Sequence, residues 1–281
     1  MLNSAIIKKI SDFVYAKPRS IQEIAHHIQK NWRTADSYVE KIMKEHGVLS
    51  IRTFREGTRG ALKIVFWSNI EKIHSSDFQE RLFKKIESSR DKKDFSPFDI
   101  YQYVDEKKRY AFLEEQTEDK ITSKQNMIGI LSSTQDQLLI FSGNLSWVNA
   151  SQEGKKLYDV FEELATRNVS IKALCNVNLE SMKNIQKMLE INDKLGKRMI
   201  EIKHAQQPFR AFVVDNSFVR FKEIRYSDRK QDGVKHNKYI FYDINDEEWV
   251  EWMQKIFWNL FRANISAEKR IKDIESIEKI K

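Results

Sequence analysis

The sequence is poor in the residues that mark several common classes of protein. Its 281 residues include one cysteine, Cys175, with three prolines and eight glycines. A single cysteine cannot form a disulfide within the chain, and it is too few for a cysteine-ligated zinc site. The few prolines indicate a helix-rich chain. No P-loop, G-x-G-x-x-G string or nucleophile elbow is present, so we expect no cofactor and no metal.

The chain also lacks any long apolar run. None approaches the roughly 18 residues that span a bilayer, and Lys8, Lys9 and Asp12 interrupt the start, where a signal peptide would need an apolar stretch. We therefore expect a reduced cytoplasmic protein, associated with the nucleoid if it binds DNA, and no membrane partner.

Positive charge is concentrated near the N-terminus. The net charge is +8. Residues 1–75 hold 13 Lys and Arg against 7 Asp and Glu, whereas the counts are 11 against 12 in residues 76–126 and 25 against 22 in residues 127–281. The N-terminal excess favours an anionic partner such as nucleic acid.

Residues 1–75 have the element order of a winged helix-turn-helix. Apolar periodicity predicts helices over 4–15, from Ser20 onward and over 34–46, and Ser20 with Glu23 forms a capping box. Two strands follow, 48–54 and 61–67, joined by a glycine-containing basic loop. This order places one helix in the major groove of DNA and a basic hairpin beside it.

The predicted DNA-contacting residues fall into two groups. The outward face of the third helix mixes hydroxyls with cations, which reach base edges and phosphates, and comprises Arg33, Thr34, Ser37, Tyr38 and Lys41. The wing supplies phosphate contacts, from Arg52, Arg55, Arg59 and Lys63. The alternatives are an ordinary solvated helix face and a winged helix that binds protein; the basic hairpin favours DNA.

Residues 76–126 read as a helical connector that pairs two copies of the chain. Apolar positions predict a helix over 76–89 and another starting at Ser96, separated by a polar charged run. The connector has too many alternating charges for a core. Its apolar stripes are suited to packing against the winged helix or a second subunit.

Residues 127–265 alternate strands with helices, which predicts an α/β domain with a mixed sheet. The expected strands are 128–131, 138–142, 169–177, 200–202, 209–215, 218–221 and 239–242, and the expected helices are 150–168, 179–195 and 247–264. Residues 266–281 form an amphipathic helical tail with Ile271, Ile274, Ile277 and Ile280. The fold class is thus α/β and multidomain.

Several strings resemble the TrmB-like transcriptional regulators, in which a winged helix precedes a dimerising connector and a phospholipase D-like domain. They are LLIFSGNLSW (138–147), RNVSIKALC (167–175), PFRAFVVDNSFVRF (208–221) and MQKIFWNLF (253–261). The resemblance spans nearly the whole chain. It implies a dimeric DNA-binding regulator whose C-terminal domain senses a small molecule, and no sugar-contact motif carries over.

The catalytic phospholipase D motif, H-x-K-x4-D, is degenerate at the position implied by this resemblance. Arg210 replaces the lysine, Asp215 matches the aspartate, and Pro208 replaces the histidine nucleophile. Proline cannot attack phosphorus. We therefore expect no enzyme there, and a candidate ligand pocket made of Ser142, Asn144, Arg210 and Asp215.

A second string, residues 236–243, matches the motif letter for letter with His236, Lys238 and Asp243. It lies later than the fold would place it, so an exposed basic loop entering a strand is the simpler interpretation. The sequence hypothesis is a dimeric, sequence-specific double-stranded DNA-binding regulator. The alternatives are a phosphodiesterase or nuclease that uses His236, and a non-specific architectural DNA-binding protein.

Overall fold

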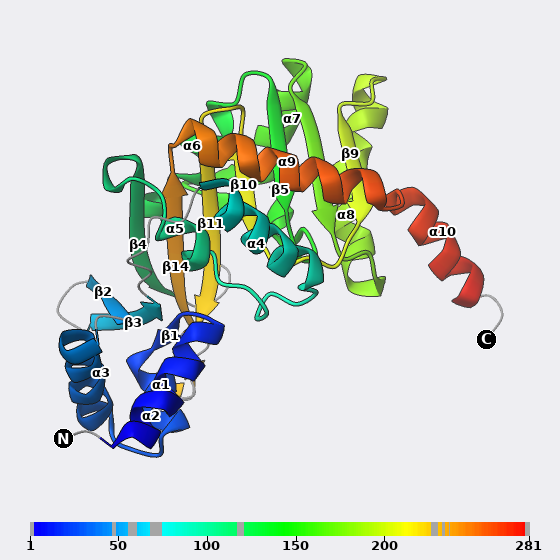
Figure 1. Ribbon diagram of the computed structural model, residues 1–281. Helices are drawn as coiled ribbons and strands as arrows, with labels where there is room; N and C mark the ends of the chain where they lie inside the picture. The colour runs from blue at the N-terminus through cyan, green and yellow to red at the C-terminus, as the bar shows by residue number, and fades with distance from the viewer. Residues whose placement is uncertain are drawn as a thin grey trace.

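The structure is a computed structural model that describes residues 3–46, 49–55, 61–67, 75–116, 121–225, 230–231, 234–235 and 237–278. A winged helix lies at one end of a larger α/β body (Figure 1). No helix within these ranges is long and apolar enough to cross a membrane.

The N-terminal unit is a winged helix-turn-helix, as predicted. Its elements are α1 (Ser4–Ala16), β1 (Arg19–Ser20), α2 (Ile21–His27), α3 (Trp32–His46), β2 (Leu49–Arg55) and β3 (Ala61–Trp67). The strands form a small antiparallel sheet in the order β1-β3-β2. The capping box is confirmed, because the Glu23 N–H donates to Ser20 Oγ at 3.1 Å and the Ser20 N–H donates to Glu23 Oε2 at 2.7 Å. It fixes the start of α2.

The connector is only partly helical, which corrects the prediction for residues 76–126. It contains α4 (Ser75–Ser88), α5 (Phe98–Tyr101) and β4 (Arg109–Gln116). Strand β4 is an edge strand of the main sheet, paired antiparallel with β14 (Asn237–Ile244). Connector side chains are also core: Phe95, Phe98, Ile100 and Tyr101 are at most 2% exposed. The connector therefore contributes apolar side chains to the core, although charged segments lie between them.

The main sheet has seven strands in the order β4-β14-β11-β10-β5-β8-β9. The remaining members are β5 (Gln137–Phe141), β8 (Ser170–Cys175), β9 (Ile200–His204), β10 (Ala211–Val214) and β11 (Phe218–Arg225). Strands β5, β8 and β9 run parallel and the other neighbours antiparallel, so the sheet is mixed as predicted. The predicted strand at 128–131 is wrong: this segment is helix α6 (Met127–Ser132), because Met127 and Leu131 are buried at i, i+4 spacing.

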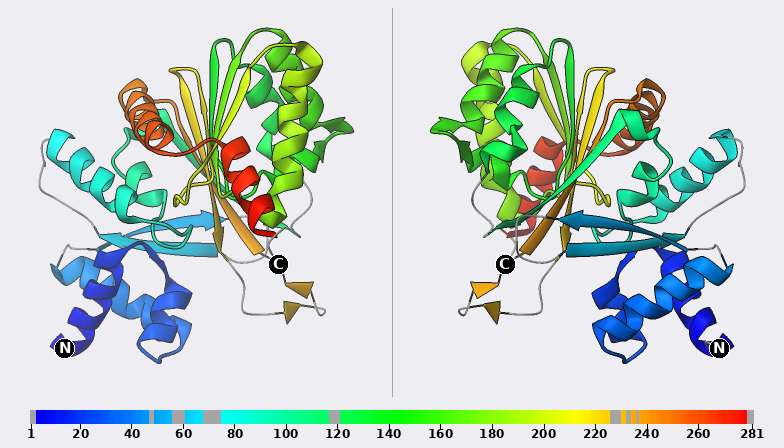
Figure 2. Two further views of the ribbon diagram at one scale, coloured as in Figure 1. Left: turned by 90° about the vertical axis from the view of Figure 1, so that its right-hand side faces the viewer. Right: turned by 90° about the vertical axis from the view of Figure 1, so that its left-hand side faces the viewer.

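Helices cover both faces of the main sheet (Figure 2). On β5, Leu138 and Ile140 face a core shared with α7 (Leu157–Thr166) and α8 (Leu179–Leu195). Leu139 and Phe141 face the other core, shared with α9 (Glu247–Ala263) and the connector. Short elements complete the described chain: β6 (Ser151–Gln152), β7 (Lys155–Lys156), β12 (Lys230–Gln231), β13 (Val234–Lys235), and 3₁₀ turns at Glu106–Lys108, Ser123–Gln125 and Ser146–Asn149.

The winged helix and the α/β body share one hydrophobic core. Phe54 and Ile64 of the hairpin belong to the same cluster as α9 and the connector. The rings of Phe54 and Tyr242 meet at 6.4 Å, and those of Phe66 and Phe98 at 4.6 Å. The β2–β3 hairpin extends to the end of the main sheet in both side views (Figure 2). The winged helix is therefore packed against the body, not merely tethered to it.

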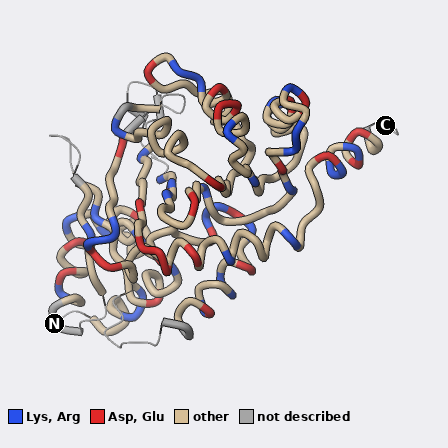
Figure 3. Tube along the Cα trace, turned by 90° about the horizontal axis from the view of Figure 1, so that it is seen from above, with Lys and Arg blue, Asp and Glu red and all other residues tan. Residues whose placement is uncertain are grey.

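The C-terminal tail forms helix α10 (Ala267–Glu278), as the amphipathic pattern predicts. Ala267 and Ile271 are buried against the core of α7 and α8, whereas Ile277 is 57% exposed. Basic and acidic residues are interspersed along this helix (Figure 3). Ile280 lies outside the described residues.

Candidate nucleic-acid interface

Helix α3 presents a polar face to solvent. Asn31 Oδ1 accepts a hydrogen bond from the Thr34 N–H at 2.8 Å, so Asn31 caps the helix, which begins at Trp32. The predicted start at Thr34 was therefore two residues late. The opposite face of α3 is buried in the winged-helix core, through Ala35, Val39 and Ile42.

The five predicted recognition residues differ in exposure. Arg33 and Ser37 are exposed, whereas Thr34, Tyr38 and Lys41 are half-buried. Tyr38 also packs against the winged-helix core. Because Arg33 and Ser37 are four residues apart, they lie on one stripe of the helix. A guanidinium and a hydroxyl on that stripe can reach base edges or phosphates.

The predicted wing residues also have different environments. Arg52 on β2 is exposed. Arg55 ends β2, and only its backbone is described. Arg59 lies outside the described residues, in the loop between the two strands. Of these three, Arg52 is the one whose side chain is described. It is paired with Ile64 and lies on the hairpin face that also carries Phe54, which is the face directed to the α/β body and away from α3.

Lys63 has a role that the sequence did not suggest. Its Nζ donates to both carboxylate oxygens of Asp36, at 2.8 and 2.6 Å, and lies 3.6 Å from Glu40. It also lies 5.5 Å from the centre of the Trp32 ring. These contacts balance its charge and hold β3 against α3, so Lys63 fixes the position of the hairpin. Asp36 and Glu40, spaced i, i+4 on α3, were the available sequence signal.

The structure separates the four residues predicted to share a ligand pocket. In the pairing of β5 with β10, Phe141 is opposite Ala211 and Leu138 is opposite Val214. Ser142 and Arg210 are therefore at one end of these strands and Asp215 at the other, roughly 17 Å away at the usual rise per residue. The prediction of one pocket that includes Asp215 is wrong, because four strand residues intervene.

Asp215 and Ser142 have local structural roles. The Asp215 carboxylate accepts hydrogen bonds from the backbone N–H groups of residues 135, 136 and 137, each at 2.9 Å. Ser142 Oγ accepts from the Leu145 N–H and from Trp147 Nε1, both at 3.1 Å. Asn144 Oδ1 accepts from the Ser146 N–H at 3.1 Å. The string after β5 is thus a hydrogen-bonded turn.

Lys92 of the connector contacts the backbone on both sides of Pro208. Its Nζ donates to the carbonyl oxygens of Gln207 and Phe209, each at 2.6 Å, on the two sides of Pro208. The Gln207 amide donates to the Ser142 carbonyl at 2.9 Å. No local pattern indicates this contact, since Lys92 stands in a polar charged run between two predicted helices.

The surroundings of Lys92 alter its protonation. Burial, with the nearby Arg210 guanidinium, lowers the pKa of Lys92 to about 6. In the same region, burial raises the pKa of Cys175 to about 12, which leaves this thiol protonated and a poor nucleophile at neutral pH.

A stability measurement can test the low pKa of Lys92. From about pH 6 up to pH 10.5, the unfolded chain holds a proton on Lys92 that the folded chain does not. The Lys92 contribution to the free energy of unfolding therefore increases with pH in this window, by up to about 1.4 kcal/mol per pH unit. In urea titrations, the difference in free energy of unfolding between wild type and Lys92→Met should increase with pH. The exposed Lys183→Met is the matched control, and equal slopes for all three proteins would contradict the assignment.

The second motif, at 236–243, is only partly described. His236 lies outside the described residues. Lys238 and Asp243 are five positions apart on β14, so they are on opposite faces and roughly 17 Å apart along the strand. Asp243 is buried and accepts from Arg220 Nε at 2.6 Å. The described residues therefore do not bring this lysine and this carboxylate together.

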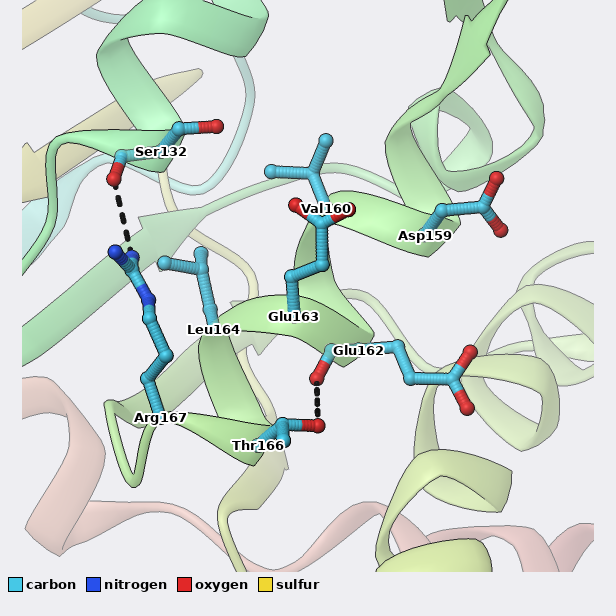
Figure 4. A pocket seen from close by; sticks show the side chains of 8 residues that line it. All are labelled: Ser132, Asp159, Val160, Glu162, Glu163, Leu164, Thr166 and Arg167. Atoms are coloured by element: carbon cyan, nitrogen blue, oxygen red, sulfur yellow. Dashed lines mark hydrogen bonds between the residues drawn. The ribbon is translucent and has the colours of Figure 1, made fainter.

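A hollow of about 690 Å³ lies over α6 and α7 (Figure 4). Asp159, Glu162 and Glu163 give it an acidic lining. Arg167 is held there by the carbonyl oxygens of Ser132 and Thr134, at 3.0 and 2.9 Å. These carboxylates repel the phosphates of nucleic acid, so this hollow is not a candidate nucleic-acid interface. The candidate interface remains on the winged helix.

Fold and site define an N-terminal winged helix-turn-helix packed on an α/β domain with a mixed sheet. No protein-family model and no curated protein matches the sequence. Among solved structures, the chain is similar to TrmBL2, an archaeal chromatin protein whose structure shows a novel mode of DNA binding, at 13% identity and a TM-score of 0.38, over 93% of this chain and 94% of that one.

Two phospholipase D-like structures are similar to part of the chain. Nuc from Salmonella typhimurium, a phospholipase D family member, has 9% identity and a TM-score of 0.38, over 56% of this chain and 97% of its own. NucT from Helicobacter pylori has 10% identity and a TM-score of 0.39, over 56% and 99%.

Proposed function

We propose that this protein binds double-stranded DNA through its winged helix. The observation that carries the proposal is the exposed polar stripe of α3, with Arg33 and Ser37. The hairpin next to α3 adds an exposed cation, Arg52, on its other face. Lys63 holds this hairpin against α3 through Asp36. Helix α3 would enter the major groove while Arg52, Arg55 and Arg59 meet phosphates.

We further propose that the protein is a dimeric, sequence-specific transcription regulator associated with the nucleoid. One recognition helix reads a half-site, and a symmetric pair reads a palindrome. The apolar connector residues Phe95, Phe98, Ile100 and Tyr101 are buried in the core of a single chain, so they are not available to pair two copies. The exposed Ile277 of α10 makes this helix a candidate for pairing.

We propose that the α/β domain is not a phosphodiesterase. Pro208 stands in place of the nucleophile, and the Lys92 Nζ bonds the carbonyl oxygens on both sides of it. That reaction requires a nucleophile, which proline cannot supply. The domain then positions the winged helix.

Selection of bound duplexes from random DNA tests the proposed function. We expect enrichment of a palindrome whose half-sites are about 10 base pairs apart, or a multiple of this spacing, which would report both sequence specificity and twofold symmetry. Footprinting across a genome would then show sharp promoter sites. Broad coverage without a motif would instead support an architectural protein, and no retained duplex would contradict DNA binding.

A further inference from the structure

A cleft of about 750 Å³ lies between the winged helix and the α/β body. Nine Lys and Arg side chains line it, but only two carboxylates, Glu23 and Glu223. The cations come from both sides of the cleft: Lys17 and Arg19 belong to the winged helix, and Arg210 and Arg225 belong to the body. The cleft is large enough for a small organic ligand.

Both carboxylates are already engaged by neighbouring groups. Glu23 accepts from Ser20 Oγ at 2.8 Å and from Arg225 Nη1 at 3.0 Å. Glu223 accepts from the Tyr242 hydroxyl at 2.8 Å and lies 2.9 Å from Arg225 Nη2. Lys63 is balanced by Asp36, outside the cleft, and Lys92 is mostly unprotonated at neutral pH. Without these two, seven Lys and Arg side chains still line the cleft against two carboxylates. Arg225 Nε is buried and has no hydrogen-bond partner among the described residues.

The positive charges of the cleft also repel one another, which lowers the pKa of some of them. Burial, followed by the charges of Arg19 and Arg225, lowers the pKa of Lys17. Burial is the main cause of the lowered pKa of Arg19, and the charge of Arg225 adds to it. An anion placed among these groups would relieve both the desolvation and the repulsion.

The lining includes rings beside the cations. The Arg19 guanidinium lies 3.9 Å from the centre of the Phe13 ring, and Phe13 is stacked on His27 at 3.9 Å. Trp32, at the start of α3, is 40% exposed and also lines the cleft. Arg19 and His27 cover Phe13. The exposed ring of Trp32 is therefore the apolar surface available to a ligand that carries an organic group next to its charge.

We propose that this cleft binds a small phosphorylated molecule, a phosphate ester or polyphosphate with at least two negative charges. Because its cations come from both domains, the bound anion bridges the winged helix and the body. The binding site does not depend on DNA binding; only its use as a regulatory signal rests on the proposed function.

Isothermal titration calorimetry of the full chain tests the site with tripolyphosphate, ATP and adenosine. We expect tripolyphosphate and ATP to bind with one-to-one stoichiometry and adenosine not to bind. Arg19→Gln and Lys17→Gln should each weaken tripolyphosphate at least tenfold, while the exposed Lys183→Gln binds it like wild type. Thermal melting shows whether each variant is folded.

Three outcomes would overturn the proposal. These are no heat with either phosphate compound, undiminished binding by both folded cleft variants, and adenosine binding as tightly as ATP. A fourth outcome would also overturn it, and it concerns the source of the phosphate. If a duplex displaces tripolyphosphate, and Arg19→Gln weakens duplex binding as much as Arg33→Ala does, the cleft binds the phosphates of DNA rather than a small molecule. Arg33→Ala should leave tripolyphosphate binding unchanged, so failure of the DNA proposal is recognised separately.

Discussion

Replacing Arg220 with methionine is expected to lower the free energy of unfolding by about 3–5 kcal/mol. Arg220 on β11 is 5% exposed, and Asp243 on β14 is 8% exposed. The Arg220 Nε donates to Asp243 at 2.6 Å, and its Nη1 donates to the Gln125 carbonyl oxygen. Methionine keeps an unbranched apolar chain beside the rings of Phe112 and Phe241, but it leaves the Asp243 carboxylate buried without its cation. Urea titration at neutral pH measures the loss.

Two controls distinguish the lost ion pair from general damage. Arg262→Met changes an exposed arginine on α9, and its unfolding free energy should be within about 0.5 kcal/mol of wild type. Arg220→Met combined with Asp243→Leu removes both charges and should recover most of the loss. If the double variant is less stable than Arg220→Met, the carboxylate is not the source of the destabilisation.

Replacing Arg33 and Arg52 with alanine is expected to weaken duplex binding about tenfold each and about a hundredfold together. Both side chains are exposed, one on α3 and the other on β2. Arg33 should affect the selected sequence more than random duplexes if it reaches a base edge, whereas Arg52 should affect all duplexes alike because it meets phosphate. Fluorescence anisotropy with the selected duplex and a scrambled duplex measures both effects.

Arg262→Ala is the matched control for these two variants, because it removes an exposed arginine from α9 in the α/β body. It should bind both duplexes like wild type. Equal weakening by Arg262→Ala would mean that net charge alone, rather than the winged-helix surface, governs affinity.

The winged helix could be predicted from sequence because its signals are local. The capping box at Ser20 and Glu23 and the apolar periodicity of α2 act within a few residues. Likewise, Gly196 ends α8 with φ of 61°, which glycine adopts without strain, so the predicted end of that helix is confirmed.

The errors arose where distant residues decide the structure. Strand β4 pairs with β14, which lies more than 100 positions later in the chain. Because charged residues flank β4, its sequence does not have the pattern of a strand. Lys92 and Lys63 look like exposed cations in sequence, yet one bonds the backbone around Pro208 and the other bonds Asp36. Tertiary contacts of this kind leave no periodic signal.

The central claim is that the face formed by α3 and the β2–β3 hairpin binds double-stranded DNA. Its most direct test is the affinity for the selected duplex over a range of KCl concentrations, for wild type and Arg52→Ala. The logarithm of the wild-type association constant should fall linearly with the logarithm of the salt concentration, and Arg52→Ala should reduce this slope by about one. Salt-independent binding, or identical affinity and slope in the variant, would contradict the account.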